Sequence, residues 1–290
     1  MTFELKKGDM RAVARSLGGE LVSLRDRDGL EYIWQGDPAF WSGQNPILFP
    51  IVGSLKDGRV DIGGKTCEMG RHGFARGLEF TPVDQGEDFV TLALGENEQT
   101  LEQYPFPFAL EATHRLLEDG FSTTLTVRNT GAVPMPFCVG AHTAIRCPLQ
   151  AGERFEDYEL LFEVSEQADS HLLNAQGIIR HDGRMPMLDG SRMPLRYQTF
   201  GELDTVIFSM LRSGGVSLLH RETGRGVQLD FHEFPMVAFW TKPEAPFLCL
   251  EPWQGCAAWD NESGKFEDKP FCTTLEPGRE KTLTYAFHIV

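Results

Sequence analysis

The feature that most constrains the fold is the alternation of apolar and polar residues along short segments. Residues 121–128, 226–232 and 281–288 each alternate with a period of two, which is typical of a β-strand with one buried face. Turn-forming residues separate many such segments, at 26–29, 63–64, 118–120, 213–215 and 223–224. The sequence therefore predicts an all-β protein whose many short strands form large twisted sheets.

Helical patterns are few. Residues 95–104 predict a short helix that ends before Pro105, and a turn at 38–41 is a second, weaker candidate. Glycine and proline are spread along the chain, and no linker or repeat divides it. We therefore expect a single domain over residues 1–290.

The net charge and the pattern of cysteines indicate which binding partners and which cellular compartment the sequence favours. The 42 Asp+Glu outnumber the 27 Lys+Arg and give a formal charge of −15, which disfavours nucleic acid and anionic membranes as partners. No apolar run approaches the roughly 18 residues of a membrane span, and the first residues lack the apolar segment of a signal peptide. The six cysteines form no C-x-x-C pair, so we expect reduced thiols and a cytoplasmic protein.

The clearest candidate for chemistry is a carboxylate that ends an apolar run. Glu251 follows residues 245–250 and precedes Pro252, which predicts that the strand stops there because proline cannot donate to a sheet ladder. Partial burial would raise the pKa of Glu251 and make it a better proton acceptor. An exposed glutamate at a strand terminus explains the pattern equally well.

A second candidate is His142, which interrupts the apolar segment 137–145. The small residues Gly140 and Ala141 precede it and leave room for a ligand or for another backbone. On this pattern alone, a core histidine bonded to a backbone carbonyl is the simpler interpretation.

A third candidate is the donor-rich segment that contains Arg71, His72 and Arg76 among glycines. A solvated turn is a fair alternative for it. Asp204 is a weaker candidate because it precedes an apolar run, and Trp253, like Trp240, either offers a flat face to a sugar ring or belongs to the core.

Motifs for phosphate loops, dinucleotide folds, nucleophilic serines and zinc proteases are absent. We therefore expect no cofactor and no metal. Two histidines and a carboxylate are able to ligate a metal ion, and they also suffice for cofactor-free acid–base catalysis on a polyol.

Several segments in sequence order resemble the aldose 1-epimerase (mutarotase) superfamily, and most closely its LacX-like branch. The segments that carry the main resemblance are Leu-Phe-Pro-Ile-Val-Gly at 48–53, His-Gly-Phe-Ala-Arg at 72–76, Gly-Ala-His at 140–142 and Glu-Pro-Trp-x-Gly at 251–255. Residues 18–24, 32–41 and 275–278 extend the resemblance to nearly the whole chain.

The resemblance implies a galactose-mutarotase-like β-supersandwich that interconverts the α and β anomers of an aldose. It implies that Glu251 is the general base and that protonated His142, kept charged by a neighbouring carboxylate, is the general acid. It places His72 and Asp204 among the substrate-binding residues, and we expect Arg71, Arg76 and Trp253 to join them. The expected partner is a small sugar, and the expected assembly is a monomer or a homodimer.

Three positions depart from the family pattern. Ser54 stands where relatives often carry an arginine, and Arg71 or Arg76 is expected to supply that donor. Thr143 and Ile145 replace a proline and a phenylalanine after the second histidine, which we expect to alter the pocket wall and therefore the preferred sugar.

Other activities stay open at this point. A hexose-6-phosphate mutarotase would need an arginine pair, for which Arg71 with Arg76 or Arg146 is available. A non-catalytic carbohydrate-binding protein on the same fold ranks next. A glycan lyase or hydrolase ranks third, because this chain has no room for an extra helical domain.

Overall fold

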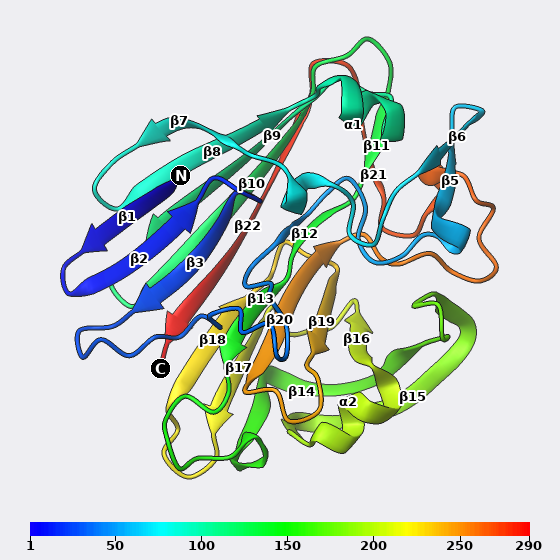
Figure 1. Cartoon of the computed structure of the whole chain (residues 1–290). Coiled ribbons are helices and arrows are strands. Elements are labelled where there is room, and N and C mark those ends of the chain that lie inside the picture. The colour runs from blue at the N-terminus through cyan, green and yellow to red at the C-terminus, as the bar shows by residue number, and fades with distance from the viewer.

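A computed structural model describes residues 1–290, and its dominant feature is a nine-stranded antiparallel sheet (Figure 1). The spatial order of this sheet is β15 (Ile179–Pro194), β14 (Tyr158–Leu173), β17 (Gly215–His220), β18 (Gly226–Asp230), β22 (Glu280–Ile289), β10 (Gly120–Asn129), β9 (Phe108–Leu116), β8 (Phe89–Gly95) and β7 (Thr81–Gln85).

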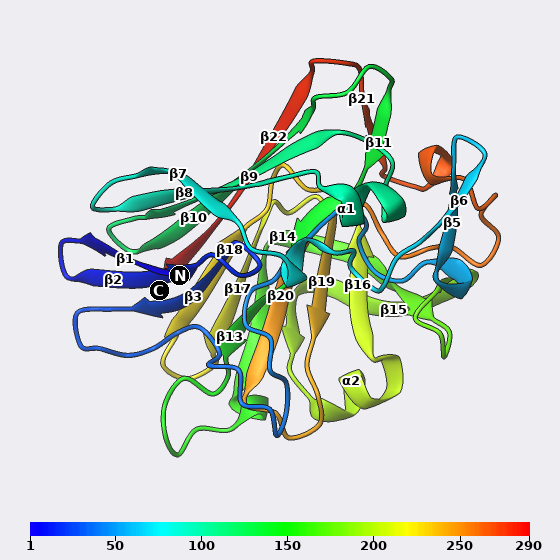
Figure 2. The ribbon, with the colours of Figure 1, turned by 45° about the horizontal axis from the view of Figure 1, so that its top comes forward.

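A second sheet carries the segments that contain Glu251 and His142. Its order is β16 (Thr205–Ser209), β19 (Met236–Trp240), β20 (Phe247–Gln254), β12 (Val139–Ala141) and β4 (Ile47–Leu48), and β13 (Thr143–Arg146) also pairs with β20. Figure 2 shows β19 and β20 in front of β14 and β17 of the larger sheet.

Smaller elements complete the fold. A three-stranded sheet packs beside β8 and β9, and it contains β1 (Thr2–Lys7), β2 (Met10–Arg15) and β3 (Glu20–Arg25). The remaining strand pairs are β5 (Arg59–Ile62) with β6 (Lys65–Glu68) and β11 (Met135–Phe137) with β21 (Thr273–Leu275). The helices are α1 (Glu98–Gln103) and α2 (Tyr197–Leu203), with single 3-10 turns at Lys56–Gly58, Ala75–Gly77, Phe155–Asp157 and Phe266–Asp268.

The predicted all-β class is confirmed, and most of the strands and helices predicted from local sequence patterns are present. The alternating segments 121–128 and 281–288 lie in β10 and β22, and β18 covers residues 226–230 of the segment 226–232. The helix predicted within 95–104 is α1, which begins where the Asn97 side chain accepts from the Thr100 N–H. Residues 38–41 form a turn and no helix, and α2 was not predicted.

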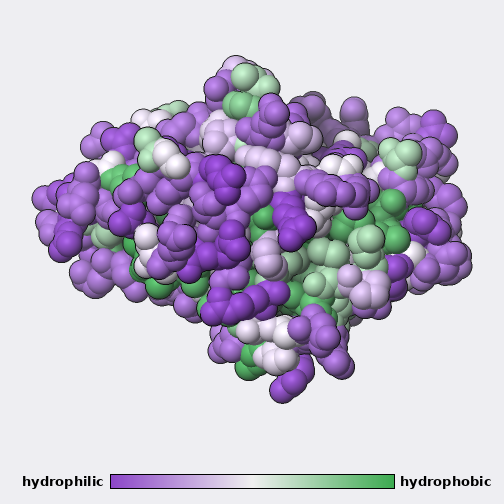
Figure 3. All heavy atoms as spheres, turned by 90° about the horizontal axis from the view of Figure 1, so that it is seen from below, coloured by the Kyte–Doolittle hydropathy of each residue, from purple (hydrophilic) through white to green (hydrophobic).

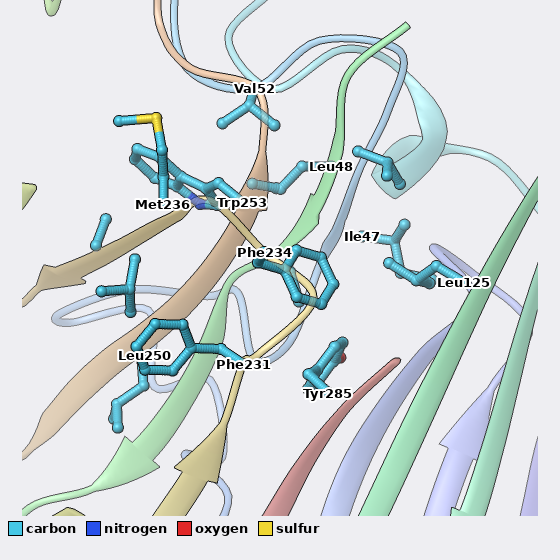
Figure 4. Packing of buried hydrophobic residues seen from close by; sticks show 14 of the residues in the cluster. Ile47, Leu48, Val52, Leu125, Phe231, Phe234, Met236, Leu250, Trp253 and Tyr285 are labelled. Carbon is cyan, nitrogen blue, oxygen red and sulfur yellow. The ribbon is translucent and has the colours of Figure 1, made fainter. Parts of the chain in front are cut away.

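Apolar side chains from both large sheets form one continuous core. Figure 4 shows part of it, where Leu125 and Tyr285 come from the nine-stranded sheet and Met236 and Leu250 come from the second sheet. All eight residues of β20 are buried, which explains why its sequence is a nearly unbroken apolar run. The face drawn in Figure 3 is mostly hydrophilic with smaller hydrophobic areas between.

All six cysteines are free thiols, as predicted. No helix of the structure has both the length and the apolar character to cross a membrane.

The loop that carries His72 depends on a glycine. Gly73 has φ +71°, and a Cβ there would lie 2.2 Å from the Phe49 carbonyl oxygen. This close approach lets Phe49 and Gly73 form a parallel bridge. Any side chain at position 73 would therefore push the His72 loop away from the second sheet.

We expect Gly73→Ala to lower the free energy of unfolding by about 2–4 kcal/mol, because it adds a clash with backbone to an unfavourable φ. The matched control is Gly64→Ala, since Gly64 also has positive φ (+84°) but faces open space, and its loss should stay near 1 kcal/mol. Urea unfolding measures both. Equal losses in the two variants would contradict the role given to the Phe49 contact.

Candidate active site

The sheet register places His142 directly opposite Glu251. Gly140 pairs with Trp253 and Thr143 pairs with Leu250, so the positions between them face each other across the two strands. The distance from His142 Nε2 to Glu251 Oε1 is 3.4 Å. Side chains opposite each other on one face of an antiparallel pair are in contact range.

The prediction that the strand ends at Pro252 is wrong, because β20 continues to Gln254. The ladder of β20 changes partner at this point, from β13 to β12. Pro252 has no N–H to donate, and a proline inside a sheet is tolerated at such an irregularity. His142 lies in the gap between the two short strands.

Both groups of the pair are buried with hydrogen-bonding capacity left over. Glu251 is 0% exposed and His142 is 8% exposed. Both Glu251 carboxylate oxygens, His142 Nδ1 and Trp253 Nε1 have no hydrogen-bond partner. Since buried polar atoms are normally bonded, this cluster is suited to a ligand rich in hydroxyl groups.

Burial controls the protonation of the pair. It raises the pKa of Glu251 well above its ordinary value and lowers the pKa of His142 to about 3, because both charged forms lose hydration. The expectation that a neighbouring carboxylate keeps His142 charged is therefore wrong for the unliganded protein. Burial therefore disfavours both the carboxylate of Glu251 and the imidazolium of His142.

His72 approaches the pair from the loop that follows β6. Its Nδ1 accepts a hydrogen bond of 3.1 Å from the Gly53 N–H, so Nε2 carries the proton of the neutral ring. Burial holds the pKa of His72 well below its ordinary value. Its φ of +67° is strained for a residue with a side chain. The His72 ring thus offers a neutral N–H donor, and its centroid lies 5.5 Å from the centroid of the His142 ring.

Arg71 supplies the guanidinium beside Ser54. Its Nε donates to Ser54 Oγ at 3.0 Å. A Cβ on Gly177, at the tip of the β14–β15 hairpin, would lie 2.5 Å from Arg71 Nη2. Of the two arginines expected to serve near Ser54, the one bonded to it is Arg71, and Arg76 contributes a second guanidinium elsewhere on the wall.

These groups line one concave cavity that is open to solvent, the usual form of a small-molecule site. All seven predicted residues line it: Arg71, His72, Arg76, His142, Asp204, Glu251 and Trp253. Asp204 follows α2 with φ +62° and accepts from the Thr205 hydroxyl at 3.0 Å. The structure therefore brings together every site residue that the sequence proposed.

Other lining residues escaped the sequence analysis. Trp41, Leu173, Gly177 and Ile207 line the cavity beside Trp240. The β14–β15 residues have no local motif, because only the long hairpin folds them over the site.

Thr143 and Ile145 do not line the cavity, so the expected change of the pocket wall at these positions is wrong. Thr143 is buried and donates to Asn45 Oδ1 at 2.6 Å. Arg146 donates to the Glu31 carbonyl and is not part of an arginine pair in the cavity. Alternation along β13 directs neighbours of His142 to the other face of the sheet.

One group in the site has the spacing of a metal centre. Ligand atoms of His142, Cys249 and Glu251 lie within 4.8 Å of one another. Burial raises the pKa of the Cys249 thiol well above its ordinary value, which disfavours the thiolate that binds metals. The prediction of a metal-free site stays a prediction.

Comparison with known proteins assigns the family. The model of the aldose 1-epimerase family matches residues 1–288. The chain belongs to the aldose 1-epimerase family. Membership supports an isomerase that acts on carbohydrates.

Individual relatives agree with this family and its fold. The chain is 37% identical over 286 residues to the chromosomal protein LacX of Lactococcus lactis subsp. lactis, covering 96% of this chain and 95% of the relative. A galactose mutarotase related enzyme from Lactobacillus acidophilus superposes with a TM-score of 0.95 at 28% identity, covering 100% and 97% of the two chains. A galactose mutarotase-like protein from Lactobacillus casei ATCC 334 gives 0.94 at 29% identity, with full coverage of both. The predicted galactose-mutarotase-like fold is confirmed.

The raised pKa of Glu251 predicts a stability cost that grows with pH. An unfolded glutamate ionises near pH 4.3, whereas the folded one resists ionisation. Stability is therefore lost as the pH rises from this value toward the folded pKa. We expect the stability advantage of Glu251→Gln over the wild type to be larger at pH 8 than at pH 5. This advantage should grow by up to about 1.4 kcal/mol for each pH unit.

Urea unfolding at several pH values measures this difference. Glu202→Gln is the matched control, because Glu202 is exposed on α2 and its replacement should give no such trend. A pH-independent difference for Glu251→Gln would show that the carboxyl group is not perturbed.

Proposed function

We propose that the protein is an aldose 1-epimerase that interconverts α and β anomers of a free aldose. The observation that carries the proposal is the buried Glu251–His142 pair, 3.4 Å apart at the wall of an open cavity, with unpartnered polar atoms on both residues. Family membership supports the same reaction class.

The chemistry needs one proton acceptor and one proton donor. The acceptor removes the proton of the anomeric hydroxyl O1 while the donor protonates the ring oxygen O5. The C1–O5 bond breaks, the C1–C2 bond rotates, and O5 then attacks the other face of the aldehyde. In ring closure the two groups exchange roles, so each turnover leaves them as they began.

The protonation of the pair matches both halves of this cycle. Carboxylate with imidazolium serves ring opening, in which Glu251 accepts from O1 and His142 donates to O5. Neutral carboxylic acid with neutral imidazole, the form that burial favours, serves ring closure. Nε2 and Oε1 are 3.4 Å apart, so both groups reach the same end of a bound sugar.

The remaining lining residues orient the ring. The Nε2–H of His72 and the guanidinium of Arg71 donate to sugar oxygens. Asp204 accepts from a hydroxyl, and Trp253 supplies an apolar face with a free indole N–H. Such positioning groups raise the rate by holding reacting atoms in place.

We expect Glu251→Gln and His142→Gln each to lower the rate of anomer exchange by about 10²–10⁴-fold, since each removes one positioned proton-transfer group. Magnetisation-transfer NMR over a panel of free aldoses measures exchange at equilibrium. Glu202→Gln, on the surface of α2, should keep the wild-type rate.

Exchange at the wild-type rate in Glu251→Gln would contradict the assignment. Saturable sugar binding by the wild type without any acceleration would instead favour the non-catalytic carbohydrate-binding protein.

A second candidate substrate is a hexose 6-phosphate. Arg71 and Arg76 line the cavity, and neither forms an ion pair with a carboxylate, although the chain carries a charge of −15. Unpaired guanidinium groups in a cavity are suited to a phosphate. Asp204 and Glu251 on the same wall favour the neutral sugar.

The two substrates are separated by comparing exchange of a free hexose with that of its 6-phosphate. If the free sugar is the substrate, Arg76→Ala should change its KM by less than about threefold, and inorganic phosphate should not inhibit. A preference for the phosphate ester of tenfold or more, lost in Arg76→Ala, would establish the second candidate.

A further inference from the structure

Trp41 is held over the active site by its own turn. The Trp34 indole N–H donates to the Trp41 carbonyl at 2.8 Å, and Lys242 Nζ donates to the Phe40 carbonyl at 2.6 Å. These bonds fix the backbone of residues 40 and 41 to the second sheet, on the side that carries the cavity.

The indole of Trp41 is packed among aromatic neighbours and one glycine. Its ring lies 4.8 Å from the His142 ring, with planes inclined by 34°, and 5.4 Å from the Trp240 ring in an edge-on arrangement. A Cβ on Gly43 would lie 2.3 Å from Trp41 Cζ2, so Gly43 leaves the space that the indole fills. Trp41 thus covers one face of the imidazole while its own edge lines the cavity.

The surroundings of His142 decide what this contact does. The titratable and charged groups that face it are Glu251, Cys249, His72, Arg71 and Arg76. Burial is the main opposition to the imidazolium, and the two arginines add to it. An indole packed against the imidazole excludes water from that ring, which favours neutral imidazole. A cation–π contact would act in the opposite direction.

We propose that Trp41 is a positioning residue of the acid–base pair, which holds the imidazole plane so that Nε2 faces Glu251 and keeps water away from it. With Trp240 it also forms an apolar wall for a C–H face of the sugar ring. This inference rests on the proposed epimerase function and adds a residue to it.

The test compares Trp41→Ala, Trp41→Phe and Phe40→Leu. Phe40 lies on the same turn and packs against Trp34, away from the cavity, so it is the matched control. We expect Trp41→Ala to lower kcat/KM for anomer exchange by about tenfold or more. We expect Phe40→Leu to match the wild type and Trp41→Phe to lie between the two.

The decisive readout is the protonation of His142. Hydration of the ring in Trp41→Ala should raise its pKa toward the ordinary value of about 6.5, so the acidic limb of the kcat/KM profile should move to higher pH. Titration of the His142 ring nitrogens by ¹⁵N NMR reports the same shift even in an inactive variant. Neither Phe40→Leu nor a general loss of stability should produce it.

The outcomes separate this inference from the function itself. If Glu251→Gln is inactive but the His142 titration is the same in Trp41→Ala and the wild type, the role of Trp41 is refuted and the epimerase stands. A His142 pKa that falls in Trp41→Ala would replace water exclusion by a cation–π contact and also overturn the inference. Full exchange activity in Glu251→Gln would refute the function on which it rests.

Discussion

The structure of the site depends on one cross-strand contact, in which a buried glutamate faces a buried histidine across a broken ladder. Pro252 has no N–H to donate, and β20 changes partner there from β13 to β12. His142 lies at that gap, so its side chain meets Glu251 on one face of the sheet. The loop of His72, the hairpin tip at Gly177 and the turn of Trp41 then close over this pair. Without it, the cavity would lack the adjacent proton acceptor and proton donor that the proposed reaction needs.

This arrangement lowers the stability of the folded protein. Glu251 and His142 are both buried with polar atoms unsatisfied, and His72 and Asp204 hold positive φ values. Each feature is unfavourable by itself, and the continuous core between the two large sheets offsets them. The same burial disfavours the charged form of both groups, and the proposed reaction uses each of them as acid and as base in turn. The strained and desolvated residues therefore lie in the proposed active site.

Much of this was accessible from the sequence, for identifiable reasons. Alternation in segments such as 121–128 reports directly on strands, and Glu251 and His142 were visible because each interrupts an apolar run. The protonation state of His142 was not accessible from the sequence. A charged imidazolium was expected because the sequence does not show how completely the fold buries this residue. The strand end predicted at Pro252 was wrong because a strand continues through a proline only where the partner strand allows it, and that partner is about 110 residues away in the sequence. Leu173 and Gly177 had no local signal, because a long hairpin brings them to the cavity.

The most direct test of the central claim is a crystal structure of the Glu251→Gln variant with an aldose bound. The account predicts the sugar in the cavity with its anomeric O1 within about 2.6–3.2 Å of the side chain at position 251. The ring oxygen should then face Nε2 of His142. A sugar bound elsewhere, or with its anomeric carbon turned toward Arg76 and away from the pair, would contradict the account.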